Sequence, residues 1–264
     1  MNKIISIIGR SNVGKSSLFN NLIKKEISIV TNKRYTTNRC VEIESKNNFV
    51  LIDTPGPIIK KLPVDFYNTN KLIYSAINKS DILIVMVTQD LISDDFFILD
   101  LIKNLNKPKV LLISKVDKIK TKHILLSLIY KLSQYSIFDA IFPLSNLTLF
   151  NIERLKVFLN ISENVFFSCN VITTDLVLDA VRQVLLTLLS NELPYNITVS
   201  LRNNDNIINS KNLYLIFFLK KECQKKIIVG KNGNMIKSIV KDIHTKLKLL
   251  SLNIEKIDIK FKYC

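Results

Sequence analysis

The segment from Gly9 to Ser16 has the residue types and spacing of a phosphate-binding loop. It reads Gly-Arg-Ser-Asn-Val-Gly-Lys-Ser and fits the pattern GxxxxGK[ST] fully, between an apolar run and a helix-length segment. In such a loop, backbone N–H groups and the helix N-terminus bind phosphates, while the lysine reaches the β and γ oxygens and the serine binds Mg²⁺. We therefore expect a nucleotide to be bound by Gly9, Asn12, Val13, Gly14, Lys15, Ser16 and Ser17, with Lys15 also catalytic and Ser16 a metal ligand.

A second phosphate signature, DxxG, stands at residues 53–56 after another apolar run. Here an aspartate can hold Mg²⁺ through water, and a glycine N–H can meet the γ-phosphate, which makes the following loop a γ-phosphate sensor. Pro57 follows, so the water-orienting glutamine of Ras-like proteins is absent, and we expect slow hydrolysis. The expected ligands are Asp53, Thr54, Pro55 and Gly56, with Asp53 on the metal and Gly56 catalytic.

Two further loops have the residues to select a base. Residues 114–117 read Ser-Lys-Val-Asp, where GTPases carry [NT]KxD. Asp117 would accept hydrogen bonds from guanine N1–H and the exocyclic amine, and Lys115 would pack over the base. Serine at 114 removes an amide that braces this loop, although its hydroxyl can substitute as threonine does. Ser145 and Asn146 stand where Ser-Ala normally lines the guanine, so we expect Ser114, Lys115, Asp117, Ser145 and Asn146 to contact it.

Thr36 and Thr37 lie in a polar stretch between helix and strand, and we expect Thr37 to close over Mg²⁺ and to act in catalysis. Asn12 resembles the asparagine that helps bind K⁺ in related GTPases. A K⁺-stimulated rate is therefore a hypothesis, and equal rates in Na⁺ and K⁺ would contradict it.

The C-terminal part carries a GxxG loop formed by Gly230 and Gly233, two of only five glycines in the chain. Glycine permits a close approach of backbone to a ligand. Between Lys220 and Lys248, nine lysines stand against two acidic residues, a local density that suits a phosphate backbone. A lysine-faced helical hairpin on a structural domain is the alternative. The expected RNA contacts are Lys226, Ile228, Val229, Gly230, Lys231, Asn232, Gly233, Ile236 and Lys237, with Ile228, Val229 and Ile236 as an apolar floor for bases.

The elements that must position these motifs alternate in the first 160 residues. Continuous apolar strands predict a sheet buried on both faces, with ligands at the carboxyl ends of its strands. Strands are expected at Ile4–Ile8, Val41–Glu44, Phe49–Asp53, Ile82–Val87, Val110–Ile113 and Ile141–Pro143. Helices are expected at Lys15–Lys24, Lys71–Asn78, Asp94–Asn104, Thr121–Ser133 and Ile152–Leu159.

After residue 160 the pattern changes. A helix at Thr174–Ser190 precedes strands at Ile197–Leu201 and Leu213–Leu219, then GxxG, a lysine-rich helix and a last strand at Ile254–Phe261. The order α-β-β-α-α-β with GxxG between the last two helices is that of a type II KH domain. We therefore predict a GTPase domain at 1–160, a linker at 161–172 and a KH domain at 173–264.

Composition limits the remaining options. The 264 residues have a formal net charge of +16, which favours an anionic partner, although heavy use of Asn, Lys and Ile is also what a biased source genome produces. Four scattered cysteines predict a reducing cytosol, with neither a zinc site nor a disulfide framework. No run approaches the ~18 apolar residues of a membrane span.

Together these motifs resemble the Era family of bacterial GTPases, over nearly the whole chain. The resemblance includes residues 9–17, 36–37, 53–56, 114–117, the Glu-Leu-Pro-Tyr at 192–195 and the segment 224–233. It implies a P-loop GTPase domain with a doubly wound, mostly parallel α/β sheet, followed by a smaller α+β type II KH domain. Ser114, Asn146 and Asn38, which stands where the family has arginine, depart from the family pattern.

The resemblance also implies a function. It predicts a GTP-hydrolysing switch that uses GTP or GDP, Mg²⁺ and K⁺, binds the 3′ end of small-subunit ribosomal RNA and assists maturation of the small ribosomal subunit. We expect a cytoplasmic monomer, and the family implies peripheral association with the inner face of the cell membrane. A non-catalytic RNA-binding assembly factor with a degraded nucleotide site remains the alternative.

Overall fold

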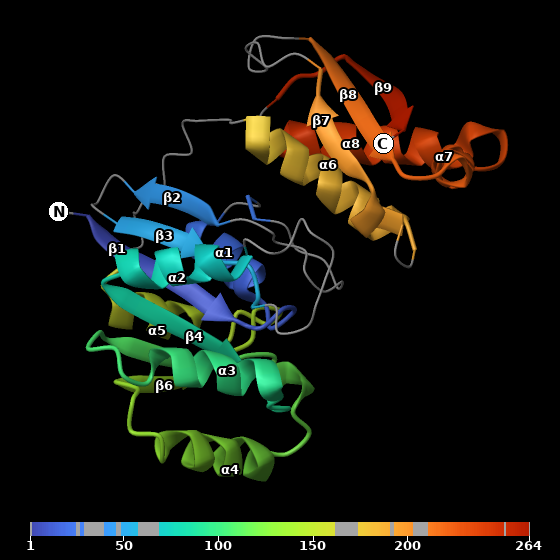
Figure 1. The fold of residues 1–264 in the computed structure, drawn as a ribbon. Helices are drawn as coiled ribbons and strands as arrows, with labels where there is room; N and C mark the ends of the chain where they lie inside the picture. Colours follow the sequence, from blue (N-terminus) through green and yellow to red (C-terminus); the bar gives the residue numbers. More distant parts are fainter. Residues whose placement is uncertain are drawn as a thin grey trace. The chain divides into compact units, whose positions relative to one another are not determined.

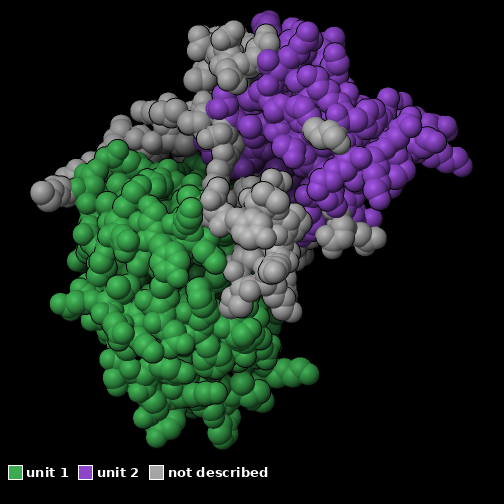
Figure 2. Space-filling view, viewed as in Figure 1, with its two compact units in different colours: residues 1–169 green, residues 170–264 purple. Residues whose placement is uncertain are grey.

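The computed structural model describes residues 2–24, 27–28, 40–45, 49–57, 69–161, 174–190, 193–202, 211–250 and 252–263. It divides into two compact units, residues 1–169 and 170–264 (Figures 1 and 2). None of the helices in these ranges is long and apolar enough to cross a membrane.

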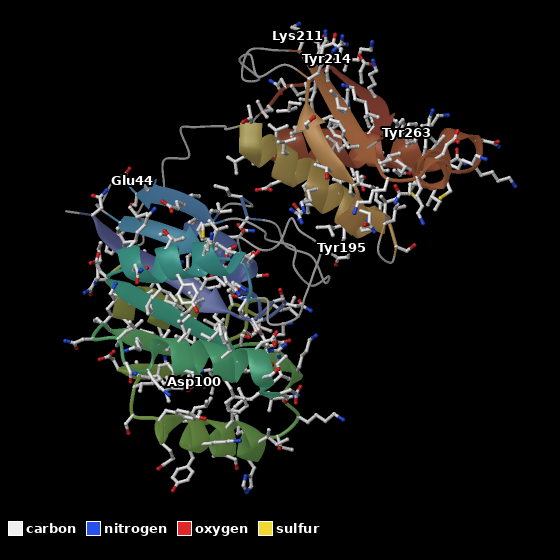
Figure 3. All side chains as sticks on the ribbon, in the orientation of Figure 1. Glu44, Asp100, Tyr195, Lys211, Tyr214 and Tyr263 are labelled. Atoms are coloured by element: carbon white, nitrogen blue, oxygen red, sulfur yellow. The ribbon has the colours of Figure 1, made fainter. Side chains whose placement is uncertain are left out.

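The first unit is built on a six-stranded sheet of order β2-β3-β1-β4-β5-β6. Its strands are β1 (Lys3–Gly9), β2 (Val41–Ser45), β3 (Phe49–Asp53), β4 (Ile82–Val87), β5 (Lys109–Ile113) and β6 (Ala140–Pro143). All neighbours pair in parallel except β2 with β3. Edge strand β2 alternates buried and exposed residues, and its exposed Glu44 is labelled in Figure 3. The central strands are buried throughout, as the apolar runs predict.

Helices cover both faces of this sheet. They are α1 (Lys15–Ile23), α2 (Thr69–Lys79), α3 (Ser93–Ile102), α4 (Lys122–Ser133) and α5 (Ile152–Leu159). Ile73, Ile98 and Leu132, from α2, α3 and α4, belong to one buried cluster with side chains of β1, β4 and β5. Helices α1 and α5 contact each other, and Figure 1 shows α5 behind the sheet when α2 and α3 lie in front. The doubly wound α/β prediction is therefore confirmed.

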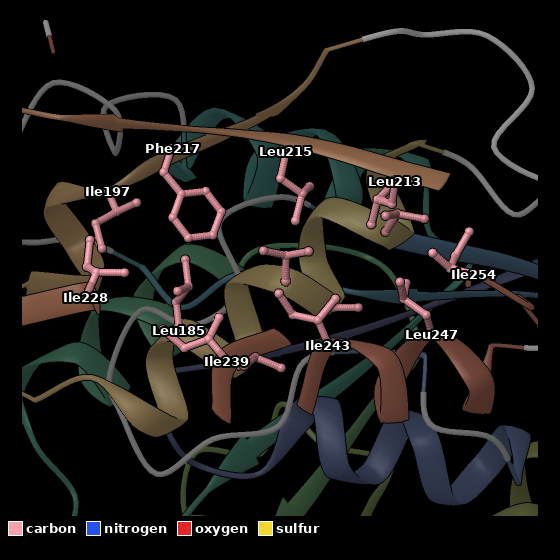
Figure 4. Packing of buried hydrophobic residues seen from close by; sticks show 14 of the residues in the cluster. Leu185, Ile197, Leu213, Leu215, Phe217, Ile228, Ile239, Ile243, Leu247 and Ile254 are labelled. Atoms are coloured by element: carbon pink, nitrogen blue, oxygen red, sulfur yellow. The ribbon is translucent and has the colours of Figure 1, made fainter. Parts of the chain in front are cut away.

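The second unit has the element order α-β-β-α-α-β. Its elements are α6 (Thr174–Leu188), β7 (Thr198–Leu201), β8 (Asn212–Leu219), α7 (Glu222–Val229), α8 (Asn234–Leu249) and β9 (Lys256–Tyr263). Strand β8 lies in the middle of the sheet, antiparallel to β7 and parallel to β9. Alternate side chains of β8 (Leu213, Leu215 and Phe217) point toward the helices and pack on Leu185 of α6 and residues of α8 (Figure 4). This separate core positions the GxxG loop.

Candidate nucleotide site and nucleic-acid interface

The phosphate loop begins at the carboxyl end of β1, and α1 begins at Lys15. Asn12 has φ of 65° and Gly14 has φ of 104°, both in the left-handed region, and asparagine and glycine tolerate that region best. Val13 is completely buried, so its side chain offers no surface to a nucleotide. The backbone conformation of the phosphate loop therefore depends on the asparagine and the glycine of the motif.

Lys15 is buried beneath this loop. Its Nζ donates to the carbonyl oxygens of Gly9 at 2.8 Å and Arg10 at 2.9 Å. Burial lowers the pKa of Lys15 to about 8, and the nearby carboxylate of Asp53 partly opposes that shift. An anionic phosphate would stabilise the ammonium form here.

Asp53 ends β3 as a fully buried side chain. Its Oδ2 accepts hydrogen bonds from Ser16 Oγ at 2.6 Å and Ser28 Oγ at 2.5 Å, whereas Oδ1 has no partner among the described residues. Burial raises the pKa of this carboxyl, and the charge of Lys15 and the two hydroxyls oppose the shift. An orphaned buried carboxylate oxygen beside a serine hydroxyl fits Mg²⁺, which prefers oxygen ligands and is held by few of them from the protein.

Gly56 lies against the phosphate loop. A Cβ at this position would meet Ser11 N at 2.4 Å and Ser11 Oγ at 2.7 Å, so only glycine allows this approach. Thr54 is fully buried, and its Oγ1 donates to the carbonyl of Ile7 at 2.8 Å, which ties the segment to β1. The DxxG segment is thus held where the nucleotide's terminal phosphate is expected. Thr36 and Thr37 lie outside the described residues.

The two base loops leave the carboxyl ends of β5 and β6 and bind the phosphate loop. Ser114 Oγ donates to the Val13 carbonyl at 2.7 Å and also lies 3.0 Å from the Val87 carbonyl. Asn146 Nδ2 donates to the Gly14 carbonyl at 2.9 Å. The structure therefore joins the phosphate and base motifs into one site.

Asp117 lies at the exposed end of this arrangement. Ser145 Oγ donates to Asp117 Oδ1 at 2.5 Å, and the same hydroxyl oxygen accepts the backbone N–H of Thr148 at 3.2 Å. These bonds orient the carboxylate between the two base loops. Lys115 Nζ donates to the carbonyl of Asn12 at 2.5 Å.

The GxxG loop joins α7 to α8. Gly230 has φ of 71°, Gly233 has φ of 75° and Asn232 has φ of 53°. A Cβ on Gly230 would lie 2.7 Å from Met235 Cβ, whereas the space beside Gly233 is open, with the nearest atom 4.0 Å away. Lys226, Lys231 and Lys237 are exposed around the loop. The backbone of α8 starts immediately after Gly233, so its first N–H groups lie near the loop.

A groove of about 520 Å³ runs along α8 from this loop. It is lined by Ile236, Lys237, Val240, Lys241, His244 and Thr245. Two of these residues were predicted from the sequence; the other four continue the same helical face at i+4 and i+8, a periodicity that could have found them. The groove combines an apolar base with a basic border.

Comparison with known proteins identifies the family. Residues 4–115 match the family described as 50S ribosome-binding GTPase. GTPase Era of Buchnera aphidicola is 34% identical over 88% of this chain and 85% of its own length. GTPase Era of Mycoplasmopsis agalactiae is 33% identical over 92% of this chain and 87% of its own. The chain belongs to the Era family of GTPases.

Solved Era structures share the fold of the whole chain. Aquifex aeolicus Era bound to GDP and AlF₄⁻ has a TM-score of 0.85 at 26% identity, covering 100% of this chain and 94% of that one. Era in complex with MgGDPNP and nucleotides 1506–1542 of 16S ribosomal RNA has a TM-score of 0.84 at 27% identity, with the same coverage. The predicted family, fold class and enzyme class, a GTPase, are confirmed.

One predicted RNA contact of this Era-family chain needs correction. Ile228 is completely buried in the core of the second unit. The preceding residue, Ile227, is exposed instead. Successive residues of a helix point to different sides, so the two isoleucines face opposite environments. The side chain of Ile228 therefore offers no surface to a base. Ile236 and Val240 form the apolar base of the groove instead.

Sequence reasoning also missed groups that hold the nucleotide site in place. Arg10 Nε pairs with Asp95 Oδ2 at 3.0 Å, and Arg10 Nη2 donates to Thr88 Oγ1 at 2.6 Å. Ser28 is a second hydroxyl on Asp53. Their partners are distant in sequence and follow no short motif, so only the fold reveals them.

Proposed function

We propose that this protein is a GTP-binding and GTP-hydrolysing switch whose second unit binds the 3′ end of small-subunit ribosomal RNA and which assists maturation of the small ribosomal subunit. The observation that carries the nucleotide part is the arrangement of buried Lys15, buried Asp53 and partly exposed Ser16 beside a phosphate loop that both base loops contact. Family membership supports GTP or GDP and Mg²⁺ as the cofactors.

Hydrolysis follows from these groups. Water attacks the γ-phosphorus in line and the bond to the β–γ bridging oxygen breaks, which gives GDP and phosphate. Ser16, Asp53 and the proposed ligand Thr37 would hold Mg²⁺, which would supply positive charge to the phosphate oxygens. The Lys15 ammonium would add a second charge, and we assign the Gly56 N–H to the γ-phosphate. Because Pro57 follows Gly56, no side chain there orients water, and turnover is slow; K⁺ near Asn12 is a proposed stimulant.

Guanine selectivity is assigned to Asp117. Its carboxylate accepts from guanine N1–H and N2–H₂, neither of which adenine presents. In the variant Asp117→Asn, the side-chain amide can donate to the carbonyl that xanthine carries at C2, where guanine has an amine. The variant should therefore bind xanthosine triphosphate better than GTP. Asp139→Asn is the control, because Asp139 accepts the Lys109 N–H at the opposite end of the neighbouring strands.

The decisive nucleotide experiment is a titration with fluorescent analogues of GTP, ATP and xanthosine triphosphate in Mg²⁺ and K⁺. Preference for GTP in the natural protein, and for the xanthosine nucleotide in Asp117→Asn alone, supports the proposal. Equal binding of GTP and ATP would show that base discrimination is lost. Absence of any binding would favour the non-catalytic assembly factor.

RNA binding is assigned to the GxxG loop and the α8 groove. The support is the positive φ of Gly230 and Gly233, the exposed lysines around them and an Era relative whose structure was solved in complex with 16S ribosomal RNA. We propose the same class of RNA as the partner of this chain.

Gly233→Asp is a sharper test than a change at Gly230, because the space beside Gly233 is open. Aspartate and asparagine both tolerate its backbone angle, so Gly233→Asn is a neutral control of nearly identical size. We expect Gly233→Asp to weaken binding of a single-stranded RNA with the small-subunit 3′ sequence by about tenfold relative to Gly233→Asn. Equal binding by both variants, or equal binding of a scrambled RNA, would contradict the assignment.

A further inference from the structure

Three successive carbonyls of the phosphate loop each accept a side chain from a base loop. Lys115 Nζ donates to Asn12 O at 2.5 Å, Ser114 Oγ to Val13 O at 2.7 Å and Asn146 Nδ2 to Gly14 O at 2.9 Å. Gly14 O also accepts the N–H of Leu18 at 2.9 Å, at the start of α1. The third of these ties depends on an asparagine that stands where the Ser-Ala pattern has alanine.

Asn146 is itself held in position. Asn21 of α1 donates through Nδ2 to the Asn146 carbonyl at 3.1 Å and lies 3.4 Å from its Oδ1. A Cβ on Gly14 would come within 2.9 Å of Asn146 Nδ2, so the amide is seated directly on the glycine. These contacts fix where the phosphate loop stands relative to the base loop.

We propose that Asn146 is a positioning residue for the guanine nucleotide. Its carboxamide supplies a second tie to the phosphate loop, beside the single hydroxyl that serine offers at position 114, where the NKxD pattern has an amide. This inference rests on the proposed function, because a brace between phosphate and base loops matters only where one ligand spans both.

The physical reason lies in the number of hydrogens that each side chain can donate. A serine hydroxyl has one hydrogen to donate, whereas a carboxamide has two. The single hydrogen of the Ser114 hydroxyl is shared between the Val13 and Val87 carbonyls, at 2.7 and 3.0 Å. Asn146 adds an N–H donor at the next carbonyl along the loop, Gly14 O. With both ties the phosphate loop is held before the nucleotide arrives, which lowers the cost of ordering it on binding.

The test is the rate of dissociation of a fluorescent GDP analogue from four forms of the full chain: the natural protein, Asn146→Ala, Ser114→Asn and the double variant. Asn146 does not have positive φ, so alanine is compatible with its backbone. We expect Asn146→Ala to speed dissociation about three- to tenfold, the range for one lost neutral hydrogen bond. The double variant, in which Ser114→Asn supplies an amide in place of the one that is lost, should release GDP more slowly than Asn146→Ala, with the single Ser114→Asn variant as the reference for that comparison.

Asn151→Gly is the matched control. Asn151 Nδ2 donates to the Pro143 carbonyl at 2.8 Å in the same segment, and within the described part of the chain this side chain forms no hydrogen bond with the phosphate loop. Its φ is 61°, so glycine introduces no strain. This variant should leave the dissociation rate unchanged.

The outcomes separate the two proposals. If the natural protein binds GTP and Asn146→Ala releases GDP no faster, the brace is refuted and the proposed function stands. Failure of the natural protein to bind GTP refutes both. An equal effect from Asn151→Gly would make the loss a general loosening of the segment and also refute the brace. If Asn146→Ala does not fold, the double variant decides: recovery of folding and GDP binding supports the brace, and no recovery overturns it.

Discussion

At the scale of single residues, the nucleotide site is defined by buried groups that need a ligand. Lys15 is buried with a lowered pKa, and Asp53 keeps one oxygen that has no partner in the part of the chain that the structure describes. Burying charged or unpartnered polar groups costs stability, so such groups persist where a ligand completes them. The same logic makes Gly56 informative, because its backbone lies where no side chain fits.

Gly56→Ala should separate the two nucleotide states. The new Cβ would meet the Ser11 backbone N at 2.4 Å, so the DxxG segment must move away from the phosphate loop. Because we assign the Gly56 N–H to the γ-phosphate, affinity for a non-hydrolysable GTP analogue should fall about tenfold, while GDP affinity changes much less. Calorimetric titration with each nucleotide measures this difference. Equal losses for GTP analogue and GDP would show that Gly56 serves only loop packing.

Two cysteines should differ in reactivity with pH. Burial, followed by the charges of Glu42 and Asp53, raises the pKa of the Cys40 thiol to about 11, whereas Cys223 is exposed on α7. The thiolate is the reactive form, so at pH 8 iodoacetamide should label Cys223 quickly and Cys40 slowly. Cys40 labelling should rise steeply as pH increases toward 11, and folding stability should fall between the unfolded pKa, about 9, and 11. Peptide mapping by mass spectrometry resolves the two sites; equal labelling at pH 8 would contradict the burial of Cys40.

At the scale of elements, the loops at the carboxyl edge of the sheet are anchored to the helices behind them. The Arg10–Asp95 pair links the phosphate loop to α3, with the Asp95 side chain fully buried and the Arg10 side chain 14% exposed. Asp95 also accepts the Ile92 N–H at the start of α3 at 3.0 Å. One carboxylate therefore holds both the loop and the helix end.

Asp95→Ala should destabilise the protein by about 3–5 kcal/mol, because it leaves the Arg10 charge buried without its partner. Asp100→Ala is the control on the same helix: its pair with Lys103 is exposed, and it should change stability by less than about 0.5 kcal/mol. Asp100 is labelled in Figure 3. Urea unfolding followed by circular dichroism measures both variants, and similar midpoints would contradict a structural role for the buried pair.

The sequence was sufficient for most elements but not for the contacts between loops. Strand β4 was predicted at its observed bounds and α5 likewise, because continuous apolar runs and helical periodicity are local signals. The burial of Ile228 was missed because the neighbouring apolar residues of α7 look alike in the sequence. Only the orientation of the helix decides which of them faces the core. Asn146 was expected to contact the guanine. Its bond to Gly14 could not be predicted, because it depends on a fold that brings together residues far apart in sequence.

At the scale of the whole molecule, two units with separate cores carry the two proposed activities. The first unit holds the phosphate and base loops, and the second holds the GxxG loop with its surrounding lysines. Residues 211–264 contain thirteen lysines and four acidic residues, so binding of RNA should weaken steeply with salt. A switch requires more than the attraction between lysines and the RNA backbone. The affinity for RNA must also differ between the GTP-bound and the GDP-bound protein.

That coupling can be measured as a closed thermodynamic cycle on the full chain. If GTP raises affinity for the small-subunit 3′ RNA by some factor, RNA must raise affinity for GTP by the same factor. We expect a factor between about 5 and 150, the usual range for linked sites, with a non-hydrolysable GTP analogue compared against GDP. Gly233→Asp should remove the effect of RNA on nucleotide binding while leaving GTP affinity itself unchanged, because the variant alters only the second unit. A factor of one in both directions would mean that the units bind their ligands independently, and the protein would then be a GTPase joined to an RNA-binding domain without a switch.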